Sequence, residues 1–135
     1  MFMLDTNICI YLINHRDGVL RDRFEANAAD VCISSITYAE LCYGVAHSAR
    51  IAANVQELEA FRLDLDILPF DWNAGRHYGE IRHALAQRGQ PIGANDLLIA
   101  AHARSANATL VTNNAREFQR VPDLRVENWM GGPSA

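Results

Sequence analysis

The fold is decided first by the stretch Phe2-Met3-Leu4-Asp5-Thr6, in which a short apolar run ends at a carboxylate. Such a run is typical of a buried strand, and a helix is predicted to begin near Thr6. Asp5 could merely cap that helix. However, an unpaired charge directly after a buried strand is costly, which favours a functional role for Asp5.

The same alternation continues along the chain. Further strands are predicted at residues 31–33, 67–70 and 109–112 and within 124–129. Helices are predicted at residues 17–28, 36–46 and 49–63, from Asp71 to Gly89, from Asn95 or Asp96 to Ala106, and at 113–118. Short apolar strands that alternate with helices indicate an α/β fold, with a parallel sheet and helices on both faces.

Length and composition narrow the class of protein. The chain has 135 residues, of which 50% are hydrophobic and 21% charged, so we expect one domain over residues 1–130 and a flexible tail at 131–135. No apolar run is long enough to cross a membrane, and the start does not resemble a signal peptide, so the expected location is the cytoplasm. The cysteines Cys9, Cys32 and Cys42 lie among apolar residues and are expected to be buried, reduced thiols.

The net charge of −4 is unlike the basic stripe of most nucleic-acid binders. All 12 basic residues are Arg, which excludes any mechanism that needs a lysine.

Acidic residues follow several of the predicted strands. The carboxyl ends of parallel strands share one edge of the sheet, where ligands bind, so residues far apart in sequence should meet there. The acids predicted to meet are Asp5, Glu40, Asp96 and Glu117, with Asn113 and Asn114 beside them. The alternatives are a solvated helix face for Glu40 and a helix-dipole role for Asp96, but both residues have apolar neighbours. Asp71 also follows a strand, but it precedes a polar helix and is interpreted as a cap.

Several carboxylates in one cleft call for a cation. Two like charges 4 Å apart repel by about 4 kcal/mol at an effective dielectric constant near 20. Mg²⁺ or Mn²⁺ removes this conflict because hard cations prefer oxygen ligands. No zinc-type Cys/His cluster occurs, and the five histidines are scattered. An oxygen-lined divalent site suits phosphodiester hydrolysis.

Five blocks of sequence occur in order between Met3 and Trp129. They are Met3-Leu4-Asp5-Thr6-Asn7, Glu40-Leu41 with Tyr43-Gly44, Pro91-Ile92-Gly93-Ala94-Asn95-Asp96-Leu97-Leu98-Ile99-Ala100, Leu110-Val111-Thr112-Asn113-Asn114, and Glu117-Phe118. This ordered set resembles the VapC toxins, which are PIN-domain ribonucleases of type II toxin–antitoxin systems. The resemblance implies a single PIN domain with sheet order 3-2-1-4-5 and Mg²⁺-dependent endoribonuclease activity. It also implies a homodimer and a VapB antitoxin whose C-terminal segment fills the cleft.

The resemblance also assigns roles to residues. Asp5 and Asp96 match the metal-binding aspartates, and Glu40 matches the second acidic catalytic position. A fourth acid often follows strand four in the family, but Asn114 stands there and is neutral, so Glu117 would supply the charge. The number of metal ions, one or two, therefore stays open. Thr6 and Thr112 match hydroxyl positions that orient carboxylates or water, and Asn7 supports the first motif. VapC toxins with a Met-Leu-Asp-Thr-Asn start resemble nucleases of the initiator-tRNA anticodon loop.

Arginines near the acidic blocks are candidates for binding RNA phosphates, since guanidinium groups bind them through paired hydrogen bonds. These candidates are Arg16, Arg21, Arg23, Arg116 and Arg120. The alternative for each is a solvated helix face.

Three other classes compete with a nuclease. A phospho-acceptor signalling domain normally needs a lysine, which this chain lacks. A haloacid-dehalogenase-type phosphatase normally has a second Asp where this chain has Asn7. A catalytically weak or inactive PIN module that binds RNA or a protein partner stays open because Asn114 is neutral.

Overall fold

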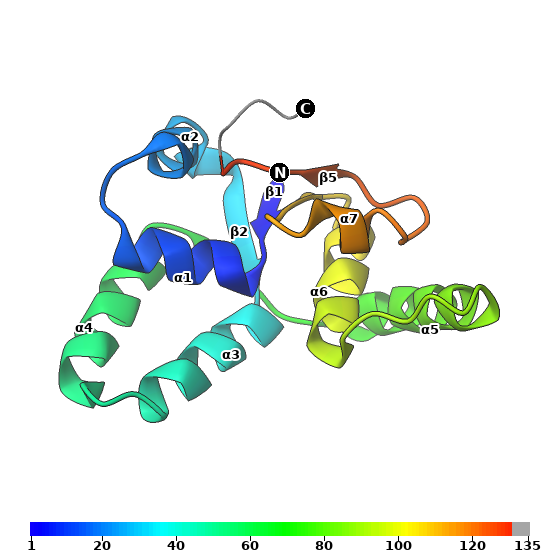
Figure 1. The fold of residues 1–135 in the computed structure, drawn as a ribbon, viewed down its shortest axis with the longest axis horizontal. Coiled ribbons are helices and arrows are strands. Elements are labelled where there is room, and N and C mark those ends of the chain that lie inside the picture. The colour runs from blue at the N-terminus through cyan, green and yellow to red at the C-terminus, as the bar shows by residue number, and fades with distance from the viewer. Residues whose placement is uncertain (131–135) are drawn as a thin grey trace.

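A computed structural model describes residues 1–130, which form a five-stranded parallel sheet with helices on both faces (Figure 1). The strands are β1 (Phe2–Leu4), β2 (Val31–Ser34), β3 (Asp66–Leu68), β4 (Thr109–Val111) and β5 (Val126–Glu127). Their order is β3-β2-β1-β4-β5, which confirms the order that the resemblance implied. The central strand β1 pairs with both β2 and β4, so Met3 lies between Cys32 and Leu110.

The helices agree with the predicted ones to within a few residues. They are α1 (Thr6–Asn14), α2 (Val19–Ala26), α3 (Ser35–Ala46), α4 (Ile51–Arg62), α5 (Trp72–Gln87), α6 (Ala94–Ser105) and α7 (Ala115–Phe118), with a 3₁₀ turn at Ala28–Asp30. Helix α6 begins at Ala94, after Gly93, and not at Asn95 or Asp96 as predicted. Strand β3 lies at the sheet edge and ends before Pro69, which has no N–H to donate to a neighbouring strand.

Side chains that alternate along the strands fill two separate cores. Met3, Cys32 and Leu110 pack toward α5 and α6 on one face of the sheet. Leu4, the next residue of β1, packs on the other face with α1, α2 and α4. Figure 1 shows these two groups of helices on opposite sides of the strands. Burial on both faces explains why the strands read as continuous apolar runs.

Two strands, β1 and β2, pass directly into capped helices, and β3 does so after Pro69 and Phe70. The side chain of Asp5 caps α1, that of Ser34 caps α3 and that of Asp71 caps α5. The capping role predicted for Asp71 is confirmed: its Oδ1 accepts a hydrogen bond from the Ala74 N–H at 2.9 Å. Ser34 Oγ also lies 2.7 Å from Nδ1 of the buried His102, which ties the end of β2 to α6.

One prediction about the cysteines is wrong. Cys9 and Cys32 are buried free thiols, but Cys42 is exposed. It belongs to the outward stripe of α3, with Ala39, Tyr43 and Ala46, because these positions share one helix face. Among residues 1–130, no helix is both long and apolar enough to span a membrane. The prediction about the tail lies outside the described residues.

Candidate active site

Asp5 lies at the carboxyl end of the central strand and is 4% exposed. Its Oδ1 accepts a hydrogen bond from the Ile8 N–H at 2.9 Å, and its own N–H donates to the Val111 carbonyl at 3.0 Å. Burial raises the pKa of Asp5, and the nearby Glu40 raises it further, while hydrogen bonds from the Thr112 hydroxyl and the Ile8 N–H lower it. The prediction that a carboxylate follows a buried strand therefore agrees with the structure.

Glu40 approaches this point from the second turn of α3. Both of its carboxylate oxygens accept hydrogen bonds, one from the Thr6 hydroxyl and the other from Asn95 Nδ2 at 2.9 Å. The Thr6 hydroxyl also lies 3.4 Å from that of Thr37, a fully buried residue one turn before Glu40. Residues of α1 and α6 thus hold a side chain of α3.

Asp96 lies in the first turn of α6 and is half-buried. Burial is the largest cause that raises its pKa, to about 6, and repulsion by Glu117, Asp5 and Glu40 adds to it in that order. Repulsion of this kind requires the four carboxylates to share one region. The structure therefore brings together all four acids that the sequence placed at this sheet edge.

Glu117 reaches the site from the short helix α7. Its Oε2 accepts a hydrogen bond from Asn114 Nδ2 at 2.8 Å, and its Oε1 lies 3.4 Å from the N–H of Gly93, which precedes α6. The Asn114 N–H donates to the hydroxyl of the buried Thr112 at 2.9 Å. The neutral Asn114 thus orients an acid one turn later along the chain.

The carboxylates surround a common region without forming a closed ligand cage. Within residues 1–130, no three side chains of the His, Cys, Asp or Glu types are grouped so that they could hold a metal ion among them. The remaining motif residue, Asn7, is exposed in the first turn of α1.

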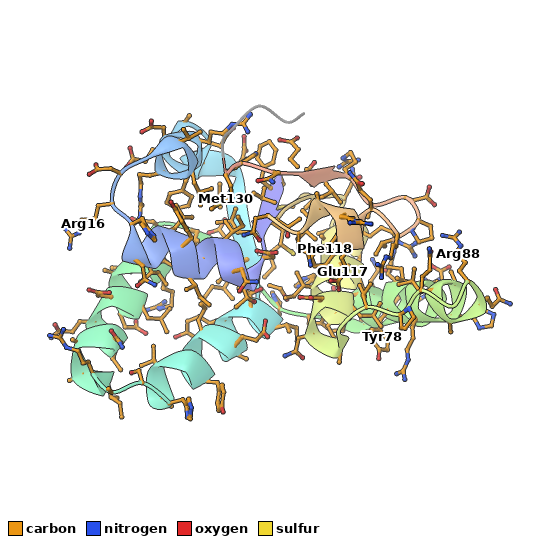
Figure 2. The ribbon with its side chains drawn as sticks, in the orientation of Figure 1. Arg16, Tyr78, Arg88, Glu117, Phe118 and Met130 are labelled. Atoms are coloured by element: carbon orange, nitrogen blue, oxygen red, sulfur yellow. The ribbon has the colours of Figure 1, made fainter. Side chains whose placement is uncertain are left out.

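The five candidate arginines separate into two groups. Arg21 donates to backbone carbonyls at the end of α1, Arg23 donates to the Asn128 carbonyl at 3.3 Å, and Arg16 lies far from Glu117 (Figure 2). In contrast, Arg116 flanks Glu117 on α7, and Arg120 donates to the Pro91 carbonyl at 3.4 Å, just before α6. Arg120 thus contacts the segment that precedes α6, and Arg116 is exposed next to Glu117 in the sequence.

Arg88 is not among the five arginines predicted from the sequence. Its Nη1 donates to the Arg120 carbonyl at 3.4 Å, and Figure 2 shows it to the right of Glu117, by the outer end of α5.

Three other contributors were not recognised from the sequence. They are the side chains of Asn95 and Thr37 and the N–H of Gly93. Asn95 was interpreted only as a possible start of α6. No local pattern could have revealed its contact with Glu40, because 55 residues separate the two.

Comparisons with known proteins agree with this fold. The family model for the PIN domain matches residues 2–124. The tRNA(fMet)-specific endonuclease VapC of Shigella flexneri is 47% identical over 128 residues, which cover 95% of this chain and 97% of the relative.

Two solved structures are also similar. A DNA-bound VapBC of Salmonella typhimurium has a TM-score of 0.92 and 45% identity, over 95% of this chain and 97% of that one. VapBC2 of Rickettsia felis, bound to a promoter DNA fragment, has a TM-score of 0.91 and 46% identity, over 95% and 98% of the two chains. The chain therefore belongs to the PIN-domain family and, within it, to the VapC proteins.

Proposed function

We propose that this chain is the cytoplasmic toxin of a type II toxin–antitoxin pair, and that it hydrolyses RNA phosphodiester bonds as an endoribonuclease. The observation that supports this most is the gathering of Asp5, Glu40, Asp96 and Glu117 at one sheet edge, where burial and, after it, the three other acids raise the pKa of Asp96 to about 6. An acidic cluster at the end of the central strand, beside the point where strand order reverses, is suited to catalysis.

The donor set fits a hard divalent cation, Mg²⁺ or Mn²⁺. All four side chains offer oxygen, and a cation would offset the repulsion that Asp96 experiences. Mg²⁺ usually keeps several waters and binds through one or two carboxylates, so it does not need a closed protein cage. Asp5 and Asp96 would hold the ion. When bound, such an ion lowers the pKa of water and stabilises charge on phosphate oxygens.

The two remaining acids, Glu40 and Glu117, would act on the attacking water molecule. Glu40 and Glu117 orient a water molecule and accept its proton as its oxygen attacks phosphorus in line. The new O–P bond forms as the bond from phosphorus to the 3′-oxygen breaks, which leaves a 5′-phosphate and a 3′-hydroxyl that takes up a proton. The Thr6 hydroxyl holds Glu40, and Asn114, anchored on the Thr112 hydroxyl, holds Glu117.

We propose initiator tRNA, cut in its anticodon loop, as the substrate. The support is the 47% identical relative named as a tRNA(fMet)-specific endonuclease. An unpaired loop suits the site because its phosphates and bases are accessible. We propose that Arg116 and Arg120 contact the phosphates next to the cleavage site, because Arg116 adjoins Glu117 on α7 and Arg120 contacts Pro91 just before α6.

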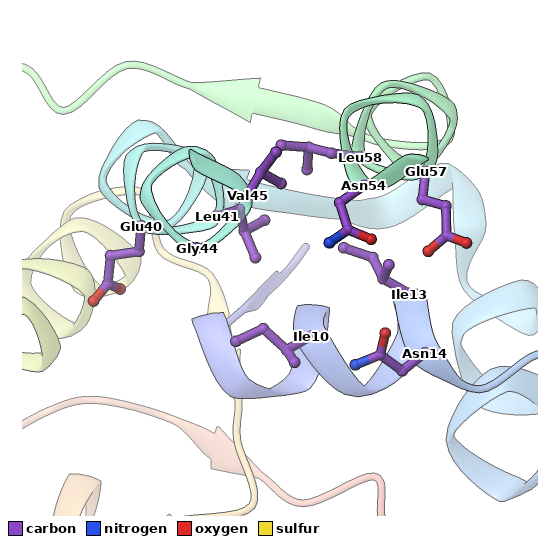
Figure 3. A pocket seen from close by; sticks show the side chains of 10 residues that line it. All are labelled: Ile10, Ile13, Asn14, Glu40, Leu41, Gly44, Val45, Asn54, Glu57 and Leu58. Atoms are coloured by element: carbon purple, nitrogen blue, oxygen red, sulfur yellow. The ribbon is translucent and has the colours of Figure 1, made fainter. Parts of the chain in front are cut away.

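A VapB-type antitoxin is the proposed protein partner, supported by the similar VapBC structures. A hollow of about 210 Å³ lies between α1, α3 and α4 and ends at Glu40 (Figure 3). Ile10, Leu41, Val45 and Leu58 give it an apolar lining. A C-terminal antitoxin segment placed here would reach the carboxylates. We also propose that the toxin is a homodimer, which sedimentation of the purified chain would test.

The decisive experiment measures cleavage of initiator tRNA by the purified chain with Mg²⁺, with EDTA, and with Asp5→Ala in place of the wild type. We expect cleavage only by the wild type with the ion, and sequencing of the RNA ends should place the cut in the anticodon loop. Cleavage that survives EDTA or Asp5→Ala would refute the mechanism. If wild-type protein binds RNA but never cuts it, the chain is an inactive PIN module.

A further inference from the structure

Glu40 is restrained from two directions, by a residue of α1 and by a residue of α6 to which the resemblance assigns no role. The Thr6 hydroxyl of α1 donates to one oxygen, and Asn95 Nδ2 of α6 donates to the other at 2.9 Å. We propose that Asn95 is a positioning residue, which fixes the Glu40 carboxylate against the start of α6 beside Asp96. This inference rests on the proposed catalytic role of Glu40.

The need for a second restraint follows from the glutamate itself. Its side chain has three rotatable bonds, and ordering such a chain costs conformational entropy. Thr6 alone holds one oxygen and leaves the carboxylate free to swing about that contact. Asn95 adds a second contact from a different helix, so the direction of both oxygens is defined before any substrate arrives. Preorganised geometry of this kind is what a group that orients water requires.

The residue type at position 95 also fits the charge of the site. An amide donates a hydrogen bond without adding charge beside Asp96, whose pKa is already raised by burial and by three other acids. An aspartate at position 95 would place another negative charge next to Glu40 and Asp96. An arginine would neutralise a carboxylate and compete with a cation. Asparagine therefore restrains Glu40 at no electrostatic cost to cation binding.

Asn95 is not needed to hold α3 and α6 together. The buried contact between Ser34 and His102 already joins the start of α3 to α6, whereas Asn95 is exposed. Loss of its side chain should therefore affect catalysis more than stability.

Asn95→Ala should lower kcat by about 10- to 100-fold, the range typical of residues that orient a ligand or catalytic group. KM for RNA should change less than about threefold, and Tm by less than about 2 °C. Asn95→Gln keeps an amide donor and should recover part of the lost activity. Asn27→Ala is the matched control, because Asn27 Nδ2 donates to the Arg23 carbonyl of α2 at 2.8 Å, and its kcat should match the wild type.

A double-mutant cycle shows whether Asn95 acts through Glu40. In a Glu40→Ala background, followed by single-turnover cleavage at high enzyme concentration, Asn95→Ala should cause less than a twofold further loss. An equal loss in both backgrounds would overturn the proposal. A second readout needs no metal or substrate: the NMR signal of the Asn95 side-chain amide should shift on Glu40→Ala, and an unchanged signal would also overturn it.

Two outcomes distinguish an error in the role of Glu40 from an error in the role of Asn95. If Glu40→Ala cleaves RNA as the wild type does, the proposed catalytic role of Glu40 is wrong. If Glu40→Ala is inactive while Asn95→Ala is fully active, only the role of Asn95 is wrong.

Discussion

The starts of α1 and α5 are alike in local geometry and differ in surroundings. At each, an aspartate follows a strand and accepts a hydrogen bond from the N–H three residues later, at 2.9 Å. Asp5 is 4% exposed and shares its surroundings with other acids, whereas Asp71 is exposed. Two aspartates with the same capping contact thus occupy different chemical settings.

The position of the preceding strand explains the difference. Asp5 follows β1, the central strand, where α3 after β2 and α7 after β4 bring Glu40 and Glu117. Asp71 follows β3 at the sheet edge, where only one neighbouring strand supplies residues. A cap at the centre of a parallel sheet becomes part of a site, and the same cap at the edge stabilises a helix.

The largest expected effect that separates the two aspartates is on catalysis. Asp5→Asn keeps an oxygen for the Ile8 N–H but loses the charge, and we expect RNA cleavage to fall by about 10³-fold. Asp71→Asn makes the same chemical change at the edge strand and should cleave within about twofold of the wild type. Rate measurements on the three proteins check this, and equal losses in both variants would remove the distinction.

The next largest difference between Asp5 and Asp71 should be in how much a metal ion stabilises their variants. A ligand at 100 times its dissociation constant stabilises the folded state by about 2.7 kcal/mol. Mn²⁺ should therefore raise the Tm of the wild type and of Asp71→Asn by several degrees, but leave Asp5→Asn unchanged. Thermal unfolding with and without the ion is the measurement. A full shift in Asp5→Asn would show that this aspartate is not a ligand.

The smallest effect concerns pH and Asp96. Because the folded state raises the pKa of Asp96 to about 6, its protonated form favours folding, and this stability is lost as pH rises from about 4 through 6. Asp96→Asn should thus be more stable than the metal-free wild type at pH 8 and equal to it at pH 4. After solvent screening, the expected difference in free energy of unfolding at pH 8 is about 1 kcal/mol, which corresponds to roughly 3–5 °C in Tm.

Asp71→Asn is the matched control for this pH dependence. It removes the charge of an exposed cap and should show no gain in Tm at pH 8 over the wild type. A gain at pH 8 as large as that of Asp96→Asn would contradict the idea that burial and crowding of acids at the central strand cause the effect.

Local patterns predicted the acids and most element limits correctly. Asp5, Glu40, Asp96 and Glu117 could be placed together because strand ends in a parallel sheet share an edge. The sheet order came from the resemblance to VapC toxins, since short apolar strands contain nothing that specifies their neighbours. The site roles of these residues are still predictions.

The misses concern contacts between distant segments. The hydrogen bond from Asn95 to Glu40 joins two helices, and its geometry depends on how α3 and α6 pack. Arg21 and Arg23 contact backbone carbonyls of α1 and of the chain after β5, and their role in RNA binding stays a prediction. Cys42 was misplaced because its apolar neighbours in sequence conceal the outward face of α3.

The hydrogen bonds that hold Glu40 and Glu117 have a consequence for how fast the protein can change its activity. Four donors from the chain itself already satisfy these acids, so the shape of the centre does not depend on an ion, unlike domains that fold only around their metal. After removal of EDTA, activity should return as fast as Mg²⁺ diffuses in, with no lag for refolding. Stopped-flow measurement of reactivation would test this. In a cell, the onset of activity would then depend on access to the cleft.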